Sequence, residues 1–232
     1  MSDLARIGWI VDAQVDFMAP EGRLYVKNLG DDTDPGSKLI VGILGQAVAW
    51  MHDHCDAMVF SGDWHSYDDA EIDAESPDPL KGTYPPHCMG RSDNPEEREG
   101  AQIIPEIRPA HPLILGMGTT EAEARALAAQ AVFERRPVFI QKDRFDVFEG
   151  NPATESLIEG LAEALARPME FYVAGVARDV CVTQAVDGMQ ARGFQVTALK
   201  DATWGLGLEP EETTLARWSR KGRVLTVAEL PE

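Results

Sequence analysis

The stretch EFYVAGVARDVCVTQAVDGMQARGFQVTAL, residues 170–199, decides the fold class. Its first part, 170–175, is mostly apolar on successive positions, which is typical of a strand covered on both faces. A helical pattern follows over 179–192 and ends at Gly193, and a second β-rich run occupies 194–199. A strand, a helix and a strand in this order predict one crossover unit of a parallel sheet.

The same alternation extends over the rest of the chain. The β-rich runs predict strands at 7–11, 57–61, 137–141, 170–175, 194–199 and 223–227. The helical patterns between them predict helices at 37–53, 120–135, 154–166, 179–192 and 210–221. We therefore predict one α/β domain over residues 1–232, with a doubly wound, mainly parallel six-stranded sheet and helices on both faces.

Two segments interrupt this alternation. Residues 62–112 are rich in Asp, Pro and Gly and predict a long irregular loop, which in a compact domain usually carries function. Residues 113–135 contain strong helix formers after a Thr cap. They predict a helical insertion that packs on the rim of the domain or at a subunit contact.

Composition and charge argue against several classes of protein. The 232 residues include 39 acidic and 21 basic side chains, and this net charge of -18 repels phosphate backbones, so we expect no nucleic-acid partner. Three cysteines do not suit a disulfide framework. No apolar run approaches the roughly 18 residues of a membrane span, and the first residues do not look like a signal peptide. We expect a cytoplasmic protein that does not enter a membrane.

Polar side chains follow the predicted strands at their carboxyl ends. Asp12 follows the first strand, Asp63 and His65 follow the second, and Lys142 follows the third. Cys181 comes shortly after the fourth. Ligands of open parallel sheets bind beyond these ends, so we expect the side chains to meet there.

Each of these residues also has an ordinary interpretation. Asp12 can be a turn residue, or a general base whose pKa is raised by burial. Lys142 can be a solvated lysine, or can hold Asp12 in place and favour a thiolate. Cys181 can be a structural cysteine, but the start of a helix lowers a thiol pKa and favours a nucleophile. The N–H groups of Ala177 and Cys181 could then bind an oxyanion.

Asp63, His65 and His87 are candidate metal ligands. Asp63 and His65 lie two positions apart, which puts both side chains on the same side of an extended segment. His87 lies in TYPPHCMG, where two prolines restrict the chain and reduce the entropy lost on organising a ligand. One carboxylate and two imidazoles suit Zn, Fe or Mn with open positions for water or substrate. Asp-x-His alone is a weak indication, and the start of a polar loop is the alternative.

Other polar residues are expected outside the site. Ordinary helix-end or loop positions are predicted for His52, His54 and His111. We expect Cys55 in the core, Cys88 as a loop thiol near the site, and the loop aspartates, including Asp68 and Asp69, on solvated surfaces.

Taken together, these stretches resemble the cysteine hydrolases of the isochorismatase-like superfamily, and most closely the nicotinamidases. IVDAQVDF resembles the segment with the catalytic aspartate, here Asp12, and SGDWHSY and YPPHC resemble the metal motifs. QKDRFDVF resembles the lysine segment, and VAGVARDVCV resembles the nucleophile segment around Cys181. The matched stretches occur in the order of the family.

The resemblance implies a chemistry and a set of roles. It implies hydrolysis of nicotinamide through a thioester, with pyrazinamide as another substrate, and with Asp12, Lys142 and Cys181 as the catalytic residues. It implies one divalent ion, most simply Zn, on Asp63, His65 and His87, and a homo-oligomer. It further implies a cis peptide before Ala177, and Phe17 and Tyr84 beside the pyridine ring.

Other functions remain open at this stage. Another small amide or carbamoyl compound, or the vinyl-ether reaction of isochorismatase, would use a related site. A non-catalytic binding subunit would lack one of the three catalytic residues Asp12, Lys142 and Cys181, and the sequence contains all three. The loop after Asp-Trp-His reads SYDDAEIDAE, where nicotinamidases often carry a further histidine. The stretch MGRSDNPEER is an addition after YPPHC.

Overall fold

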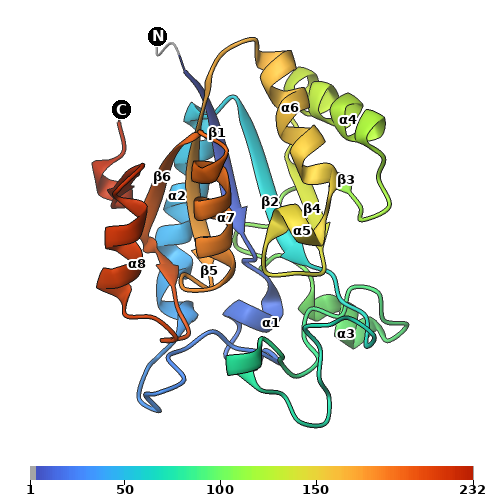
Figure 1. Ribbon diagram of the computed structural model, residues 1–232, viewed down its shortest axis with the longest axis vertical. Coiled ribbons are helices and arrows are strands. Elements are labelled where there is room, and N and C mark those ends of the chain that lie inside the picture. The colour runs from blue at the N-terminus through green and yellow to red at the C-terminus, as the bar shows by residue number, and fades with distance from the viewer. Residues whose placement is uncertain (1–3, 232) are drawn as a thin grey trace.

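A computed structural model describes residues 4–231 and contains one parallel sheet with helices on both faces (Figure 1). The sheet has seven strands in the order β3-β4-β2-β1-β5-β6-β7. The strands are β1 (Ala5–Val11), β2 (Ala57–Asp63), β3 (Leu113–Leu115), β4 (Val138–Lys142), β5 (Met169–Val176), β6 (Gln195–Trp204) and β7 (Arg223–Leu225). The predicted α/β class is confirmed, but the predicted number of six strands is wrong.

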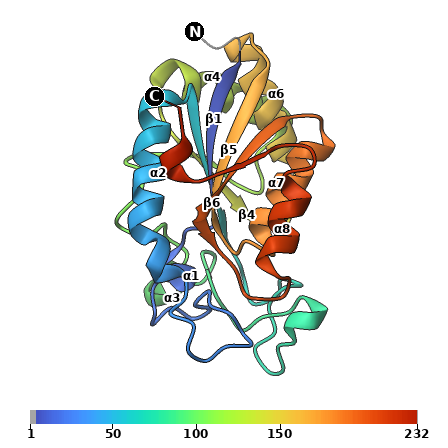
Figure 2. The ribbon, with the colours of Figure 1, turned by 90° about the vertical axis from the view of Figure 1, so that its left-hand side faces the viewer.

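The helices cover the sheet in two layers. They are α1 (Val15–Met18), α2 (Val41–His54), α3 (Pro95–Gly100), α4 (Glu121–Glu134), α5 (Val147–Gly150), α6 (Ala153–Leu165), α7 (Cys181–Ala191) and α8 (Glu211–Trp218). Short 3-10 turns occur at Ser37–Ile40, Pro79–Lys81 and Val227–Glu229. Helix α2 lies on one face of the sheet, and α6, α7 and α8 lie on the other (Figure 2). Within residues 4–231, none of the helices combines the length and the apolar character that a membrane crossing requires.

The additional strand is β3, at one edge of the sheet. It lies where we predicted the start of a helical insertion, and it pairs in parallel with β4. Helix α4 follows, with the predicted Thr cap as a capping box between Thr120 and Glu123. Residues 113–135 therefore add a strand and a helix, which form a β–α–β unit with β4 and extend the sheet. A three-residue strand is too short to show a period in the sequence, which is why the prediction missed it.

Alternate residues of β1 show how the sheet supplies two cores. Ile7 and Trp9 belong to the core beneath α4, α6 and α7, whereas Ile10 belongs to the core beneath α2. Gly8 lies on the α2 face, where a Cβ would come within 2.9 Å of the Met51 side chain. The glycine therefore allows α2 to pack closely on the central strand.

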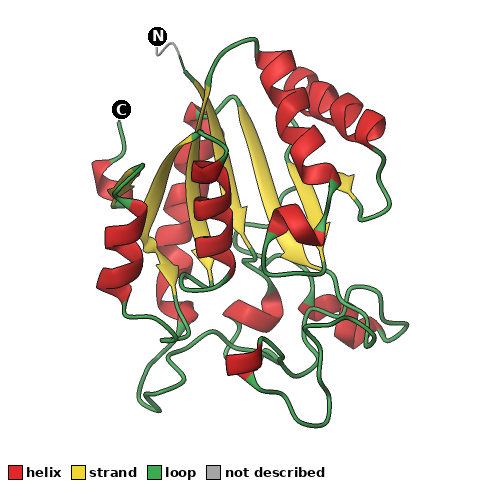
Figure 3. Cartoon of the chain, in the orientation of Figure 1, coloured by secondary structure: helices red, strands yellow, loops and turns green. Residues whose placement is uncertain are grey.

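Much of the long segment after β2 lies beyond the carboxyl ends of the strands, together with α1 (Figure 3), before the chain returns to the start of β3. It is mostly irregular, as predicted, but includes the turn at 79–81 and helix α3. Gln14 ties it to the sheet, because its amide donates to the carbonyl oxygens of Asp63 (2.8 Å) and Ala101 (2.7 Å). The Gln14 side-chain oxygen accepts the Asp63 N–H at 2.8 Å. The segment thus covers the edge of the sheet where the predicted site residues lie.

Candidate active site

Sheet register brings two buried side chains of opposite charge together. Asp63 is the last residue of β2, Lys142 is the last residue of β4, and the two are paired in the parallel ladder. Asp12 follows β1, its N–H donates to the Ser61 carbonyl at 3.1 Å, and its carboxylate accepts from the Ser61 hydroxyl at 2.9 Å. The ends of three neighbouring strands therefore place these groups on one edge.

The Lys142 ammonium lies among three acidic groups. Its Nζ is 2.8 Å from Asp12 Oδ2, forms an ion pair with Asp63 Oδ1, and lies 3.9 Å from Cys181 Sγ. All four residues are buried. The structure thus brings together Asp12, Lys142 and Cys181. It also adds Asp63 as a second carboxylate on the lysine, which the sequence did not predict.

Helix α7 begins at the thiol. Cys181 is its first residue, so the Cys181 N–H has no acceptor within the helix. The Val176–Ala177 peptide before it is cis, as the resemblance implied. Gly175 has φ +127°, and a Cβ there would lie 2.0 Å from the Val11 carbonyl oxygen. Only glycine allows this close approach between the ends of β5 and β1.

Burial and charge set the protonation of this cluster. Burial raises the pKa of Asp12, and the Asp63 charge raises it further, against the Lys142 ammonium. Burial opposes the charge on Lys142, but Asp12 and Asp63 hold its pKa well above the usual value. Burial also raises the pKa of Cys181 well above normal, with Asp12 and Asp63 adding to the rise and Lys142 opposing it. Burial and the two carboxylates thus act against the low thiol pKa that we predicted from the helix start.

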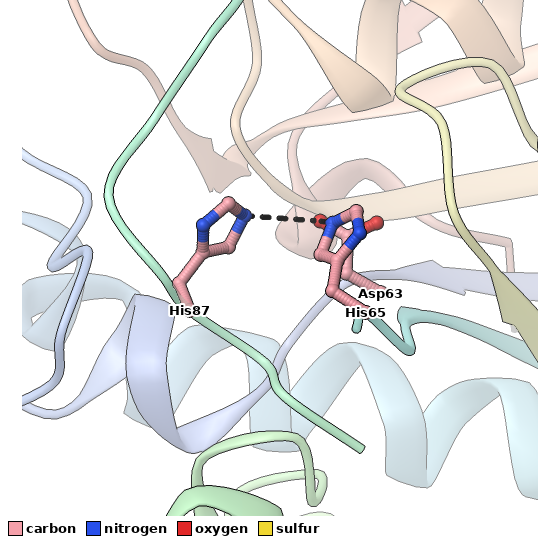
Figure 4. A group of neighbouring side chains, drawn as sticks. All are labelled: Asp63, His65 and His87. Carbon is pink, nitrogen blue, oxygen red and sulfur yellow. Dashed lines mark ion pairs between the residues drawn. The ribbon is translucent and has the colours of Figure 1, made fainter. Parts of the chain in front are cut away.

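The three candidate metal ligands face one another (Figure 4). Asp63 Oδ2 lies 3.7 Å from Nε2 of both His65 and His87, and one donor atom from each residue lies within 4.8 Å of the others. His65 Nδ1 contacts Asp69 Oδ2 at 3.0 Å, and His87 Nδ1 contacts the Pro85 carbonyl at 2.7 Å. A carbonyl only accepts, so His87 Nδ1 carries a hydrogen and a neutral His87 presents its Nε2 lone pair to Asp63.

This donor set fits a divalent cation. His65 Nε2 is buried and has no hydrogen-bond partner among the described residues, which is unusual for a buried polar atom unless something else binds it. One carboxylate and two imidazoles are ordinary ligands of Zn, Fe and Mn. The acidic groups Asp12, Asp63 and Cys181 also come within 4.8 Å of one another, but the Lys142 ammonium already lies among them.

An apolar pocket connects the thiol to the ligand cluster. Phe17 and Tyr84 line it, with ring centroids 5.3 Å and 6.2 Å from that of His87. Cys181 and Asp63 also border it, and its other walls include Leu24, Val26, Phe145 and Leu206. The free space is about 20 Å³, so a ring-sized ligand can enter only if some of these walls move apart.

Residues 10–229 match the isochorismatase domain as a family model. The chain belongs to the isochorismatase family. It is 26% identical over 219 residues to the nicotinamidase of Escherichia coli K12, covering 89% of this chain and 86% of that one.

Solved structures of this family share the fold. PnC1 from L. infantum, solved in complex with nicotinate, superposes with a TM-score of 0.68 at 20% identity, covering 100% of this chain and 97% of that one. The N-carbamoylsarcosine amidase of Thermoplasma acidophilum gives 0.64 at 17% identity, covering 99% and 100%. At these identities the likeness supports the fold and leaves the substrate open.

Sequence reasoning missed several residues that shape the site of this isochorismatase-family chain. Asp69, expected on a solvated surface, instead contacts His65 and forms an ion pair with Arg91. Asp16 accepts the Cys88 N–H at 2.7 Å and so holds the segment that carries His87. Polar residues alternate in the stretch IVDAQVDF, at Asp12, Gln14 and Asp16. This alternation could have indicated that Gln14 and Asp16 also lie at the site. The loop residues Leu24, Val26 and Leu206 gave no such indication.

The remaining predicted cysteines and histidines occupy the places expected of them. Cys55 is buried in the core beneath α2, as expected. Cys88 lies in the loop next to His87, as expected for a loop thiol near the site, and is fully buried. His52 and His54 lie in the last turn of α2, and His111 lies in the loop before β3.

Proposed function

We propose that this isochorismatase-family chain hydrolyses nicotinamide to nicotinic acid and ammonia through a thioester on Cys181. The convergence of an acid, an amine and a thiol at an apolar pocket that Asp63 and His87 also border supports the proposal most directly. The sequence similarity to a nicotinamidase supports the same substrate. Ammonia release from nicotinamide by the purified chain tests it, and no release above the uncatalysed rate would contradict it.

The first half of the reaction forms the thioester. Asp12 accepts the proton of the Cys181 thiol, and the sulfur attacks the carboxamide carbon. The N–H groups of Ala177 and Cys181 bind the oxyanion, a contribution of roughly 3–4 kcal/mol for a donor of this kind. The C–N bond then breaks, and Asp12 returns the proton to the leaving ammonia. Lys142 keeps the carboxylate in position throughout.

The second half releases the acid. Asp12 takes a proton from a water molecule, whose oxygen attacks the thioester carbon. The C–S bond breaks, and the proton returns to the sulfur of Cys181. The sum is one water consumed, and one nicotinic acid and one ammonia formed. The raised pKa of Asp12 suits a group that must accept and return a proton in each half.

A divalent metal would be held by Asp63, His65 and His87. Bound there, it would supply a Lewis acid for the pyridine nitrogen, directly or through water, and so orient the ring. Phe17 and Tyr84 would contact the faces or edges of that ring. Zn is our first choice, with Fe or Mn as alternatives, because all three accept this mixture of ligands.

We expect removal of metal to abolish the activity reversibly. A chelator should lower ammonia release from nicotinamide by at least about 100-fold, because the ring loses its orienting contact. Addition of Zn, Mn or Fe should restore it, and metal analysis of the same sample identifies the native ion. Full activity in the chelated, metal-free protein would contradict a role for the cluster.

The pocket also distinguishes neutral from acidic substrates. Among the described residues that line it, none is an arginine or a lysine. The nearby Lys142 already pairs with Asp12 and Asp63. A substrate carboxylate would therefore find no arginine or lysine partner in the pocket wall, and would have to compete for the pyridine nitrogen's place at the metal. This observation favours a neutral aromatic amide over isochorismate or an N-carbamoyl amino acid.

We expect this preference to appear in kcat/KM. Nicotinamide and pyrazinamide should exceed N-carbamoylsarcosine by at least about 100-fold, because the carboxylate of N-carbamoylsarcosine has no arginine or lysine partner in the pocket wall. Ammonia release from each compound, measured on one metal-loaded sample, gives the ratio. Faster turnover of N-carbamoylsarcosine would instead assign the site to carbamoyl substrates.

A further inference from the structure

Arg91 and Asp69 form a clamp behind the candidate metal ligands. The guanidinium of Arg91 forms an ion pair with the Asp69 carboxylate. Its Nε donates to the Trp64 carbonyl at 2.9 Å, and the backbone N–H of Arg91 donates to the His65 carbonyl at 3.1 Å. Asp69 also accepts the Ser66 N–H at 3.1 Å. These contacts fix the carboxylate relative to the backbone on both sides of His65.

The Asp69 carboxylate determines which ring nitrogen of His65 carries a hydrogen and which one can bind a metal. Asp69 Oδ2 lies 3.0 Å from His65 Nδ1, and the donors from Arg91 and Ser66 keep Asp69 as an acceptor. Nδ1 must therefore carry a hydrogen in this contact. In the neutral imidazole the lone pair is then on Nε2, the buried atom that faces Asp63 and has no hydrogen-bond partner within residues 4–231.

The same clamp joins the two halves of the ligand set. Asp63 and His65 come from the end of β2, whereas His87 belongs to the segment that continues to Arg91. The His65 N–H donates to the Cys88 carbonyl at 3.0 Å. A Cβ on Gly90 would lie 2.1 Å from the Trp64 ring, so the two segments pack closely. Arg91 thus acts on the position of both histidines.

We propose that Asp69 is a positioning residue for the metal site, and that Arg91 holds it in place. The inference rests on the metal site of the proposed function and deepens it. Asp69 fixes the ring orientation and the tautomer of His65, as carboxylates behind ligand histidines do in other metal sites. The loop after His65, SYDDAEIDAE, carries no histidine. It instead contributes the Asp69 carboxylate, which acts through His65.

Zinc affinity of the metal-free protein, measured by competition with a chromophoric chelator, tests the inference. Asp69→Asn should bind Zn roughly 10–100-fold more weakly than the wild type. Asp68→Asn, a change of the same charge at the exposed neighbouring position, should bind as the wild type does. Arg91→Met should weaken binding in the wild-type background and have a smaller effect in the Asp69→Asn background. Thermal unfolding without metal confirms that each variant is folded.

A spectroscopic measurement separates positioning from general loss of structure. The ¹⁵N shifts of the His65 ring in metal-free wild type should report a hydrogen on Nδ1, and Asp69→Asn should change that population. If Asp69→Asn does not fold, the Zn affinity of Arg91→Met decides. If the wild type binds Zn tightly and Asp69→Asn binds it as tightly as Asp68→Asn does, the inference about Asp69 is wrong. The proposed function would not be affected by that result.

Two further outcomes separate this inference from the proposed function. A wild type that binds no Zn, Mn or Fe would overturn the inference and the metal site together. The expected affinities, combined with an absence of ammonia release from nicotinamide, would support the inference and overturn the proposed substrate.

Discussion

Cys181→Ala abolishes ammonia release from nicotinamide, with kcat/KM at least about 10⁴-fold below the wild type. The reason is that no other described thiol reaches the cluster. Cys181 Sγ lies 3.9 Å from the Lys142 ammonium, whereas Cys55 belongs to the core beneath α2 and Cys88 Sγ contacts the Gly100 carbonyl at 3.8 Å. Asp12 would then have no nucleophile to deprotonate, and an attack by water alone would lack the covalent step. Steady-state assays with metal-loaded protein measure the loss.

A matched cysteine change shows that the loss is chemical. Cys55→Ala removes the same atom from a buried position, where burial raises the thiol pKa to about 12. It should keep kcat within about twofold of the wild type, because it lies outside the reacting groups. Both variants should show urea unfolding curves close to that of the wild type. Nicotinamide turnover by a folded Cys181→Ala at the wild-type rate would end the thioester mechanism.

The sequence predicts the central strands well and the edges poorly. The strands that carry the site, β1, β2, β4 and β5, are mostly apolar on successive positions, because helices or loops cover both of their faces. Strand β6 continues to Trp204, although Lys200 and Asp201 end the apolar run after Leu199. Its pairing with β5 shifts register between Val173 and Gly175, which no local pattern indicates. Short elements such as β3, α1 and α5 offer too few residues for a period.

The candidate site, like the sheet, could be predicted from the sequence only in part. Asp12, Asp63 and Lys142 could be placed on one edge because the carboxyl ends of neighbouring parallel strands meet there. That Asp63 and Lys142 are direct partners depends on the register between β2 and β4, which the apolar pattern does not fix. Contacts of Asp69 depend on the path of an irregular loop. Burial also raises the pKa of Cys181, and the burial of a side chain depends on the complete fold, which the pattern around the helix start does not reveal.

Lys142→Met should destabilise the fold and remove the activity together. The nearly isosteric change leaves the carboxylates of Asp12 and Asp63 buried without their shared cation. Loss of one partner from a buried ion pair costs about 3–5 kcal/mol, so the free energy of unfolding at neutral pH should fall by that amount. Urea unfolding in the presence of a chelator measures it without a contribution from bound metal. Turnover should fall by at least about 10³-fold, because Asp12 loses the group that positions it.

The pH dependence and a second variant identify the cause. Without the ammonium, burial and mutual repulsion should raise the pKa of Asp12 and Asp63 in the folded state above their unfolded values. A carboxyl with a raised folded pKa costs stability as pH rises, so the defect of Lys142→Met should be greatest near neutral pH and shrink as the pH falls into the carboxyl range. Lys142→Met with Asp12→Asn removes one of the two unpaired charges, and should recover part of the stability but none of the turnover. Wild-type stability of Lys142→Met at neutral pH would mean that these carboxylates do not depend on the lysine.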